Sequence, residues 1–325
     1  ARMIFNDPSS TPEQTAQALE RLTKAAEAGQ DCAQYALGKI YRDGQGVEKD
    51  IQKAVALFTL AATKENSFAA FALGKLYLAG DAALPRDPAA ALKWLTYAAE
   101  LGNQFAQYRL GKLLLKGDDG IPKDVITAIR WLTAAAKQEN GYAEYALALV
   151  YLTGEDAPKD SVKALSLLKR SAGRGNQFAQ YRLGKLLLQG EDAPKDVKAA
   201  IRWLTAAAEQ GNQYAQYALG KLYLLGKEVP KDRSSAIKWF QLAADQGNEY
   251  AQYFLKHMDD RLGQPPVAAV ISLFHHLANI FQEQNQPPPS GGVRVAVDRK
   301  LLRKIKAKKI AQGHKADDHE PEMQL

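Results

Sequence analysis

The sequence contains a single cysteine, Cys32, among 325 residues, so no disulfide can form within the chain. A chain without disulfides fits a reducing compartment better than a secreted location. No apolar run is long enough to cross a membrane, and the first residues lack the basic and apolar halves of a secretion signal. These absences predict a cytoplasmic protein that has no membrane partner.

The short motifs of common catalytic sites are also missing. The sequence has no phosphate-binding glycine loop, no G-x-S-x-G, no C-x-x-C and no H-E-x-x-H. All five histidines lie at or beyond residue 257. We therefore expect a chain that is not an enzyme, with no catalytic residue, no metal and no cofactor.

The surplus of positive over negative charge is small outside the C-terminal tail. The formal net charge is +7, and residues 291–325 hold nine Lys and Arg against five Asp and Glu. The preceding 290 residues are therefore close to neutral. A surplus of basic residues indicates acidic partners such as nucleic acid, and here only the tail shows one.

An internal repeat organises most of the sequence. Residues 175–210 recur before and after as close copies, in steps of 36 or 37 residues. A period of this length indicates a stacked array of helical units. The positions that mark the end of each copy are Gly29, Glu65, Gly102, Glu139, Gly175, Gly211 and Gly247.

Each copy predicts two helices joined by a turn. In the copy at 175–210, Ala179, Leu183 and Leu187 recur at helical spacing, so the first helix has one buried face. Pro194 prevents this helix from continuing, and Asp196 can cap the helix that follows. Residues 200–208 carry the apolar face of the second helix, and the glycine at 211 is placed to end it in the left-handed conformation.

The motifs of these copies resemble those of the Sel1-like repeat family. The family's A-x-x-x-L-G is present at 179–184, its A-P-K-D turn at 193–196, and its A-x-x-W-x-x-x-A-A-x-x-G at 200–211. The resemblance implies an all-α fold, a right-handed α-solenoid of tetratricopeptide-related helix pairs. It also implies a scaffold for protein–protein interaction, although a hydrolase role is sometimes proposed for such proteins.

We expect four regions along the chain. Residues 1–11 form an irregular lead, 12–262 the repeat solenoid, 263–285 a capping helix over the last exposed face, and 286–325 a linker with a flexible basic tail. The solenoid begins with a half unit and continues with six full units. These units are expected to start near Asp31, Ser67, Gln104, Gly141, Gln177 and Gln213.

A row of aromatic and lysine residues is the first candidate binding site. An aromatic residue precedes a lysine by four positions in most units, which places both on one face of the first helix. Such a row could line a concave groove and bind an extended peptide or protein that carries acidic residues. Alternatively, the rings pack between consecutive units and the lysines are solvated. The candidate residues are Tyr35, Lys39, Phe71, Lys75, Tyr108, Lys112, Tyr145, Tyr181, Lys185, Tyr217, Lys221 and Tyr253.

The basic tail is the second candidate site. Its cations could contact DNA phosphates, dock on an acidic protein surface, or form a solvated helix. The residues concerned are Arg294, Arg299, Lys300, Arg303, Lys304, Lys306, Lys308 and Lys309.

Parts of the tail resemble the C-terminal end of MobL-type conjugative relaxases. The stretches that carry the resemblance are 291–300, 309–315 and 317–320. In such proteins a DNA-nicking domain precedes Sel1-like repeats, and an array that begins in mid-unit agrees with a fragment of a longer chain. We expect a scaffold that recruits partners in DNA transfer. The alternative is a free-standing Sel1-like adaptor.

Overall fold

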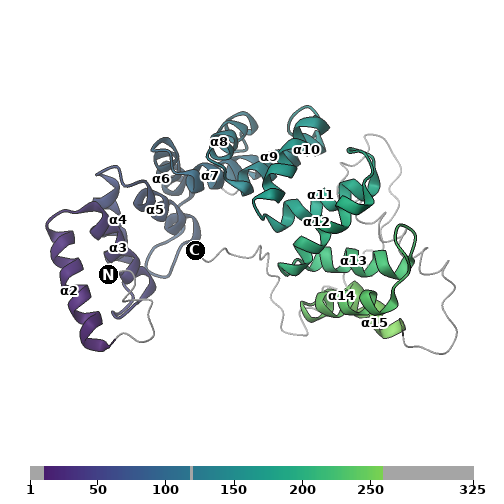
Figure 1. Cartoon of the computed structure of the whole chain (residues 1–325). Helices are drawn as coiled ribbons and strands as arrows, with labels where there is room; N and C mark the ends of the chain where they lie inside the picture. Colours follow the sequence, from purple (N-terminus) through teal and green to yellow (C-terminus); the bar gives the residue numbers. More distant parts are fainter. Residues whose placement is uncertain (1–10, 118–119, 259–325) are drawn as a thin grey trace, which may run out of the picture. The chain divides into compact units, whose positions relative to one another are not determined.

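The computed structural model describes residues 11–117 and 120–258, which form fourteen α-helices and no β-strand (Figure 1). The helices alternate between two layers, which we call the A layer and the B layer. The A layer consists of α3 (Asp31–Asp43), α5 (Ser67–Ala79), α7 (Gln104–Lys116), α9 (Gly141–Thr153), α11 (Gln177–Gln189), α13 (Gln213–Leu225) and α15 (Glu249–Met258). The B layer consists of α2 (Pro12–Glu27), α4 (Ile51–Ala62), α6 (Pro88–Glu100), α8 (Val125–Lys137), α10 (Ser161–Gly173), α12 (Val197–Glu209) and α14 (Arg233–Asp245).

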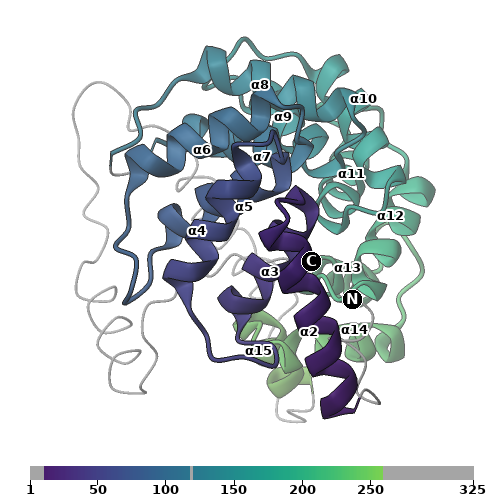
Figure 2. The ribbon, with the colours of Figure 1, turned by 90° about the vertical axis from the view of Figure 1, so that its left-hand side faces the viewer.

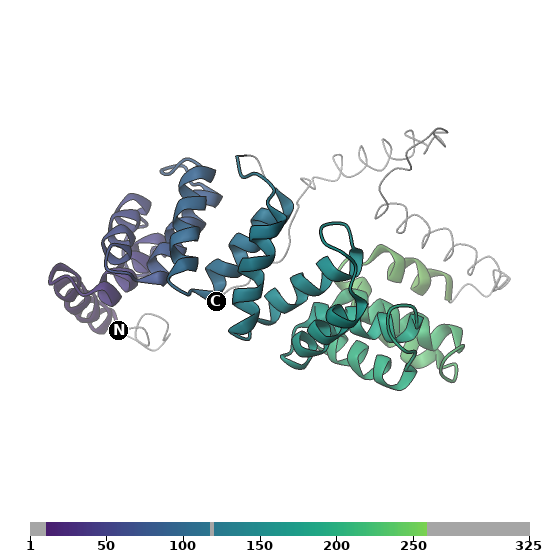
Figure 3. The ribbon, with the colours of Figure 1, turned by 90° about the horizontal axis from the view of Figure 1, so that it is seen from above.

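Each helix packs against the one before it and the one after it (Figures 1 and 3). Figure 2 shows the B-layer helices α8, α10 and α12 beside the A-layer helices that precede them. No central core exists, because every unit buries its apolar faces only against its neighbours. The described residues therefore form an α-solenoid of helix-pair repeats.

An aspartate fixes the turn from each A helix to the following B helix. The carboxylate of Asp196 accepts a hydrogen bond of 2.9 Å from the amide of Ala199, in the first turn of α12. The amide of Asp196 donates to the carbonyl of Leu187 in α11 at 2.9 Å. The same residue therefore begins one helix and ties it to the other.

An asparagine fixes every return turn from a B helix to the next unit except the first, where Gln30 precedes α3 and makes no side-chain cap. The side chain of Asn176 accepts hydrogen bonds from the amides of Phe178 and Ala179, and its amide donates to the carbonyl of Ser171. The residue before it, Gly175, has φ of 88°, which a side chain disfavours. Glu65 and Glu139 hold this position with φ of 62° and 65°, so the expected end positions are confirmed even where glycine is absent.

Close contact between the two helices of a unit explains the glycine in the middle of the A helix. A Cβ on Gly184 would lie 2.7 Å from Cγ of Leu204 and 3.0 Å from the carbonyl oxygen of Ala200. Leu204 is fully buried. Glycine costs an isolated helix about 1 kcal/mol relative to alanine, and here it allows α12 to approach α11.

The helix starts agree with the sequence prediction. The A helices begin at the six residues expected to open the units, and Thr11 caps the half unit at α2 together with Gln14. The predicted capping helix at 263–285 and the tail at 286–325 lie outside the described residues.

Candidate functional site

The A-layer aromatic residues meet across every junction between consecutive units. Each predicted ring except Tyr253, which lies on the last described helix, contacts a ring that opens the next A helix, with centroids 6.0 to 6.4 Å apart. Edge and offset contacts at this distance are favourable. The pairs are Tyr35–Phe68, Phe71–Phe105, Tyr108–Tyr142, Tyr145–Phe178, Tyr181–Tyr214 and Tyr217–Tyr250.

The second ring of each pair was missed by the sequence prediction. These residues stand three positions before the predicted aromatic of their own helix, so each A helix after α3 contributes two rings and the row continues from unit to unit; in α3 the position is Cys32. A second aromatic column at the same 36- or 37-residue step was the available signal. Phe68 and Tyr214 are about half exposed, at 51% and 53%, and Tyr253 at the end of the row is 44% exposed.

The lysines lie next to these rings, as the four-residue spacing predicts. Nζ of Lys39 lies 6.0 Å from the ring centroid of Tyr35, and Nζ of Lys75 lies 5.9 Å from that of Phe71. These distances are within the range of cation–π attraction. Packing between units and display of cations are therefore both features of this surface.

Burial changes the ionisation of the row in α9, α11 and α13. It raises the pKa of Tyr145, Tyr181 and Tyr217 further above neutral pH than the usual value. It also lowers the pKa of Lys185 and Lys221. The charge of Arg182 adds to the effect on Lys185, and the charge of Lys185 adds to that on Lys221.

A row of buried glutamines runs beneath the A-layer surface. Nε2 of Gln180 donates to the carbonyl of Ala172 at 3.1 Å, and Oε1 of Gln180 accepts from Nε2 of Gln210 at 2.7 Å. Gln107 with Gln138 and Gln216 with Gln246 repeat this arrangement. Sequence analysis missed the row, because the residues are polar and yet buried.

One junction replaces the glutamine pair with charged residues. Glu144 is fully buried, and its Oε1 accepts a hydrogen bond of 2.8 Å from Nε of Arg170. Nε of Arg174 lies 3.4 Å from Oε2 of Glu144. Nη2 of Arg170 donates to the carbonyl of Ala136 at 3.3 Å, in the role that a glutamine amide has elsewhere.

Lysines link the turns of neighbouring units along one edge. Nζ of Lys159 lies 2.8 Å from Oδ1 of Asp192, and Nζ of Lys195 lies 2.8 Å from Oε1 of Glu228. Lys49 with Asp81 and Lys123 with Asp156 make the same link. Exposed pairs of this kind each contribute about 0 to 1 kcal/mol.

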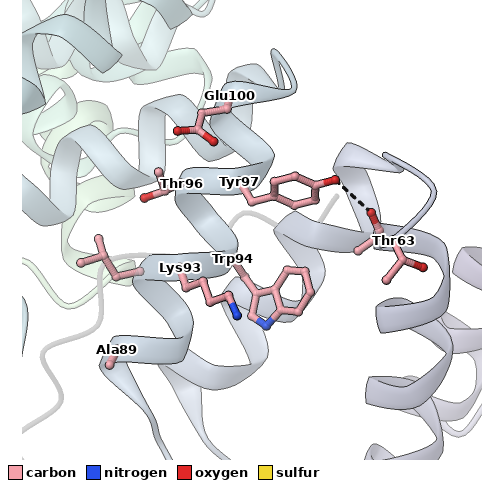
Figure 4. A pocket seen from close by; sticks show the side chains of 9 residues that line it. Thr63, Ala89, Lys93, Trp94, Thr96, Tyr97 and Glu100 are labelled. Atoms are coloured by element: carbon pink, nitrogen blue, oxygen red, sulfur yellow. Dashed lines mark hydrogen bonds between the residues drawn. The ribbon is translucent and has the colours of Figure 1, made fainter.

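A hollow of about 670 Å³ opens beside α4 and α6 (Figure 4). The hydroxyl of Tyr97 donates to the carbonyl of Ala62 at 3.4 Å, and Nζ of Lys93 lies 5.9 Å from the ring of Trp94. Thr96 and Glu100 also line it. No sequence prediction pointed to this hollow.

Other predicted features have a simpler outcome. The eight basic tail residues lie outside the described residues. Among the residues that the structure describes, no cluster of His, Cys, Asp and Glu has the arrangement of a metal site. No helix in the described ranges is long and apolar enough to span a membrane.

Comparison with known proteins shows repeats of the same kind. The Sel1 repeat model matches six segments, at 33–66, 67–103, 104–140, 141–176, 177–212 and 213–248. No curated protein matches the chain.

Two solved structures share the fold. A protective antigen of uropathogenic Escherichia coli strains, which displays an SLR fold, is 34% identical with a TM-score of 0.68. The match covers 80% of this chain and 56% of that one, so the present chain spans little more than half of its length. A Sel1 repeat protein from Oxalobacter formigenes is 28% identical with a TM-score of 0.64, over 71% of this chain and 92% of that one. The chain belongs to the Sel1 repeat family.

Proposed function

We propose that the chain is a non-catalytic scaffold whose A layer binds an extended segment of a protein partner. Sel1 repeat proteins are generally protein-interaction scaffolds. The observation that carries the proposal is the continuous row of rings, which crosses six junctions and leaves Phe68 and Tyr214 half exposed. Aromatic residues in fixed positions contribute strongly to protein interfaces, because they bury a large area with little loss of conformational freedom.

An extended partner suits this surface better than a compact ligand. The rings repeat at each unit, so the surface offers the same chemistry many times along one direction. The hollow beside α4 and α6 is lined by α6 and by the end of α4 with the turn after it, so it does not extend along the array. We therefore assign the partner to the A layer.

The proposal is tested with peptides selected by display on the whole chain. We expect Phe68→Ala combined with Tyr214→Ala to weaken the selected peptides by tenfold or more, a loss of about 1.4 kcal/mol. The matched control is Ile126→Ser with Val162→Ser, two B-layer residues that are 85% and 83% exposed. The proposal is contradicted if the A-layer variant binds the peptides as tightly as the unsubstituted chain, or if the control variant loses affinity for them.

The biological process in which the scaffold acts is a separate and more specific hypothesis than its binding role. Recruitment of partners in DNA transfer by a relaxase is supported only by the tail sequence at 291–320. A free-standing adaptor fits the repeat array equally well. Sequencing the gene upstream of Ala1 separates the two, since a relaxase requires a nicking domain with a histidine cluster there.

A further inference from the structure

The hollow beside α4 and α6 is formed by B-layer helices, so it is separate from the A-layer row of rings. Its volume of about 670 Å³ is within the range of about 300 to 1,000 Å³ that is typical of ligand pockets. Side chains of α6 form one wall, and Ala62 and Thr63 at the end of α4 form the other. The hollow is therefore large enough to hold part of a partner molecule.

Two aromatic rings form much of the α6 wall. Trp94 and Tyr97 stand three positions apart, and their rings meet edge to face, with centroids 6.2 Å apart and planes at 68°. This geometry is a favourable one, so each ring helps to hold the other in place. Both side chains are only partly buried, and both line the hollow. The hollow thus offers aromatic surface in a fixed position, which attracts apolar groups and cations.

Hydrogen-bond acceptors gather at the Tyr97 end of the hollow. The hydroxyl of Tyr97 donates to the carbonyl of Ala62 at 3.4 Å, so its lone pairs remain able to accept. Ala62 is the last residue of α4, where a helix carries partial negative charge. Glu100 stands one turn after Tyr97 on α6 and adds a full negative charge. This end of the hollow therefore favours a cation.

No cation of the described chain neutralises Glu100. Its exposed side chain makes no hydrogen bond or ion pair with another residue that the structure describes. Lys93 also lines the hollow, but its Nζ lies 5.9 Å from the ring centroid of Trp94. Lys93 and Glu100 are seven residues apart on α6, which is about 10 Å along the helix axis. Lys93 thus lies against the tryptophan at one end, and the carboxylate at the other end remains available.

We propose that this hollow binds an arginine side chain of a partner protein, with the guanidinium between Tyr97 and Glu100. A guanidinium is planar, so it stacks on an aromatic ring while its N–H groups donate to a carboxylate. Leu92 and Ala89 make the rest of the α6 wall apolar, which suits an apolar residue next to the arginine. This site does not depend on the A-layer row and goes beyond the function proposed above.

Helix α12 provides a natural comparison within the chain. A tryptophan and a glutamate recur there at the same places, as Trp203 and Glu209. The tyrosine does not recur, because Ala206 stands in the place of Tyr97. Helix α12 thus has the carboxylate without the second ring, and Glu209 is the matched control for Glu100.

The test follows the indole N–H signals of the four tryptophans by NMR while a peptide is added to the whole chain. The peptide carries one arginine between two leucines among serines and glycines, and its control carries citrulline, which has nearly the same shape but no charge. Trp94→Phe identifies the signal of Trp94. We expect this signal to move and the other three to stay, with an affinity about tenfold higher for the arginine peptide than for the citrulline peptide.

Substitutions in α6 and α12 locate the site. Glu100→Gln and Tyr97→Ala should each weaken the arginine peptide about fivefold, because one removes the carboxylate and the other removes the ring. Glu209→Gln should leave the affinity unchanged. Alanine at the tyrosine position is already present in α12, and Glu100 is exposed, so both variants are expected to fold. Circular dichroism melts check this.

Three outcomes would overturn the inference: equal affinity for the arginine and citrulline peptides, equal losses in Glu100→Gln and Glu209→Gln, or a Trp94 signal that does not move. Tighter binding of a peptide with glutamate in place of arginine would also overturn it, and would assign the hollow to an anion at Lys93. Binding of display-selected peptides to the A layer is measured separately with Phe68→Ala and Tyr214→Ala, so this inference and the proposed function can fail independently.

Discussion

The junction at Glu144 and the junction at Gln180 occupy equivalent places in the array but use different chemistry. A glutamine amide donates to one carbonyl and accepts from the next glutamine, so a single side chain satisfies both neighbours. A carboxylate only accepts. At Glu144 the carbonyl of Ala136 therefore needs another donor, and Arg170 supplies it.

The comparison shows that a buried position is defined by its hydrogen-bond partners and not by polarity alone. Replacing an amide by a carboxylate changed three residues together: Glu144, Arg170 and Arg174. In α5 the same position is Ala70, and Leu101 stands where the partner glutamine would be. In the first unit the position is Gln34, whose Oε1 is buried and has no hydrogen-bond partner among the described residues.

Removal of Arg170 should have the largest effect. Arg170→Ala leaves Glu144 buried with Arg174 alone, at 3.4 Å, and leaves the carbonyl of Ala136 without its side-chain donor. We expect a loss of about 3 kcal/mol. Because a solenoid need not unfold in one step, the measurement is native-state hydrogen exchange of the amides in α9 and α10.

Making the same substitution in a Glu144→Gln variant isolates the contribution of the buried charge of Glu144. In a Glu144→Gln chain no buried carboxylate remains, so Arg170→Ala should cost about 1 kcal/mol or less. Equal losses in both backgrounds would show that Arg170 acts by packing alone, and would remove the distinction between the two junctions.

The glycine in the middle of the A helix provides the next test. Gly184→Ala places a Cβ 2.7 Å from Leu204, and we expect a net loss of about 1 to 3 kcal/mol despite the better helix propensity of alanine. In the fourth unit Ala148 already holds this position beside Leu168, and both are buried.

The control for this change is another glycine. Gly173 lies in the last turn of α10, and a Cβ there would meet no atom within 4 Å. Gly173→Ala should leave the melting temperature unchanged or raise it. If Gly184→Ala is equally harmless, then close approach does not explain the glycine column.

The pH dependence of the Glu144 junction should be the smallest effect. A hydrogen bond from Arg174, and its charge, hold the pKa of Glu139 below the ordinary value of 4.5. Since the folded pKa is lowered, the stabilisation is present above the unfolded pKa and is lost as pH falls through the folded one. Because other acids, among them Asp192 and Asp232, also have lowered pKa values in the folded chain, we expect Glu139→Gln only to reduce the fall in the melting temperature as the pH drops below about 5.

The glutamine junctions supply the comparison for this measurement. Gln210→Ala removes a hydrogen bond without a titrating group, so it should lower the melting temperature equally at every pH. An equal fall of the melting temperature at acid pH in the unsubstituted chain and in Glu139→Gln would contradict the role assigned to Glu139.

Sequence periodicity predicted most of the fold, because the residues that start and end helices act locally. The 36-residue step was enough to place the helix-capping Asp196, the left-handed turn position at Glu139 and the glycine at 211. The helix-pair fold is confirmed, and its handedness stays a prediction. These signals depend on backbone geometry within a few residues, which the sequence contains directly.

The binding surface was only partly predictable. The column that contains Tyr181 was identified, but its partner column with Tyr214 was not, because contacts between units join residues more than thirty positions apart. The fourth unit has Glu144 and Arg174 where the fifth unit has Gln180 and Gln210. This paired substitution is recognised only when both repeat positions are compared at the same time. Ligand binding by the aromatic and lysine row stays a prediction.

The identity of α7 and α11 over most of their length has a consequence for the length of the chain. Residues 102–115 and 175–188 are the same sequence, so a deletion of 102–174 would place the second copy directly after Leu101. Helix α6 would then meet the side chains that it meets now, including a glutamine at the buried position, and α12 would still be followed by α13. Recombination between the two copies can therefore shorten or lengthen the array by two units without creating a new interface.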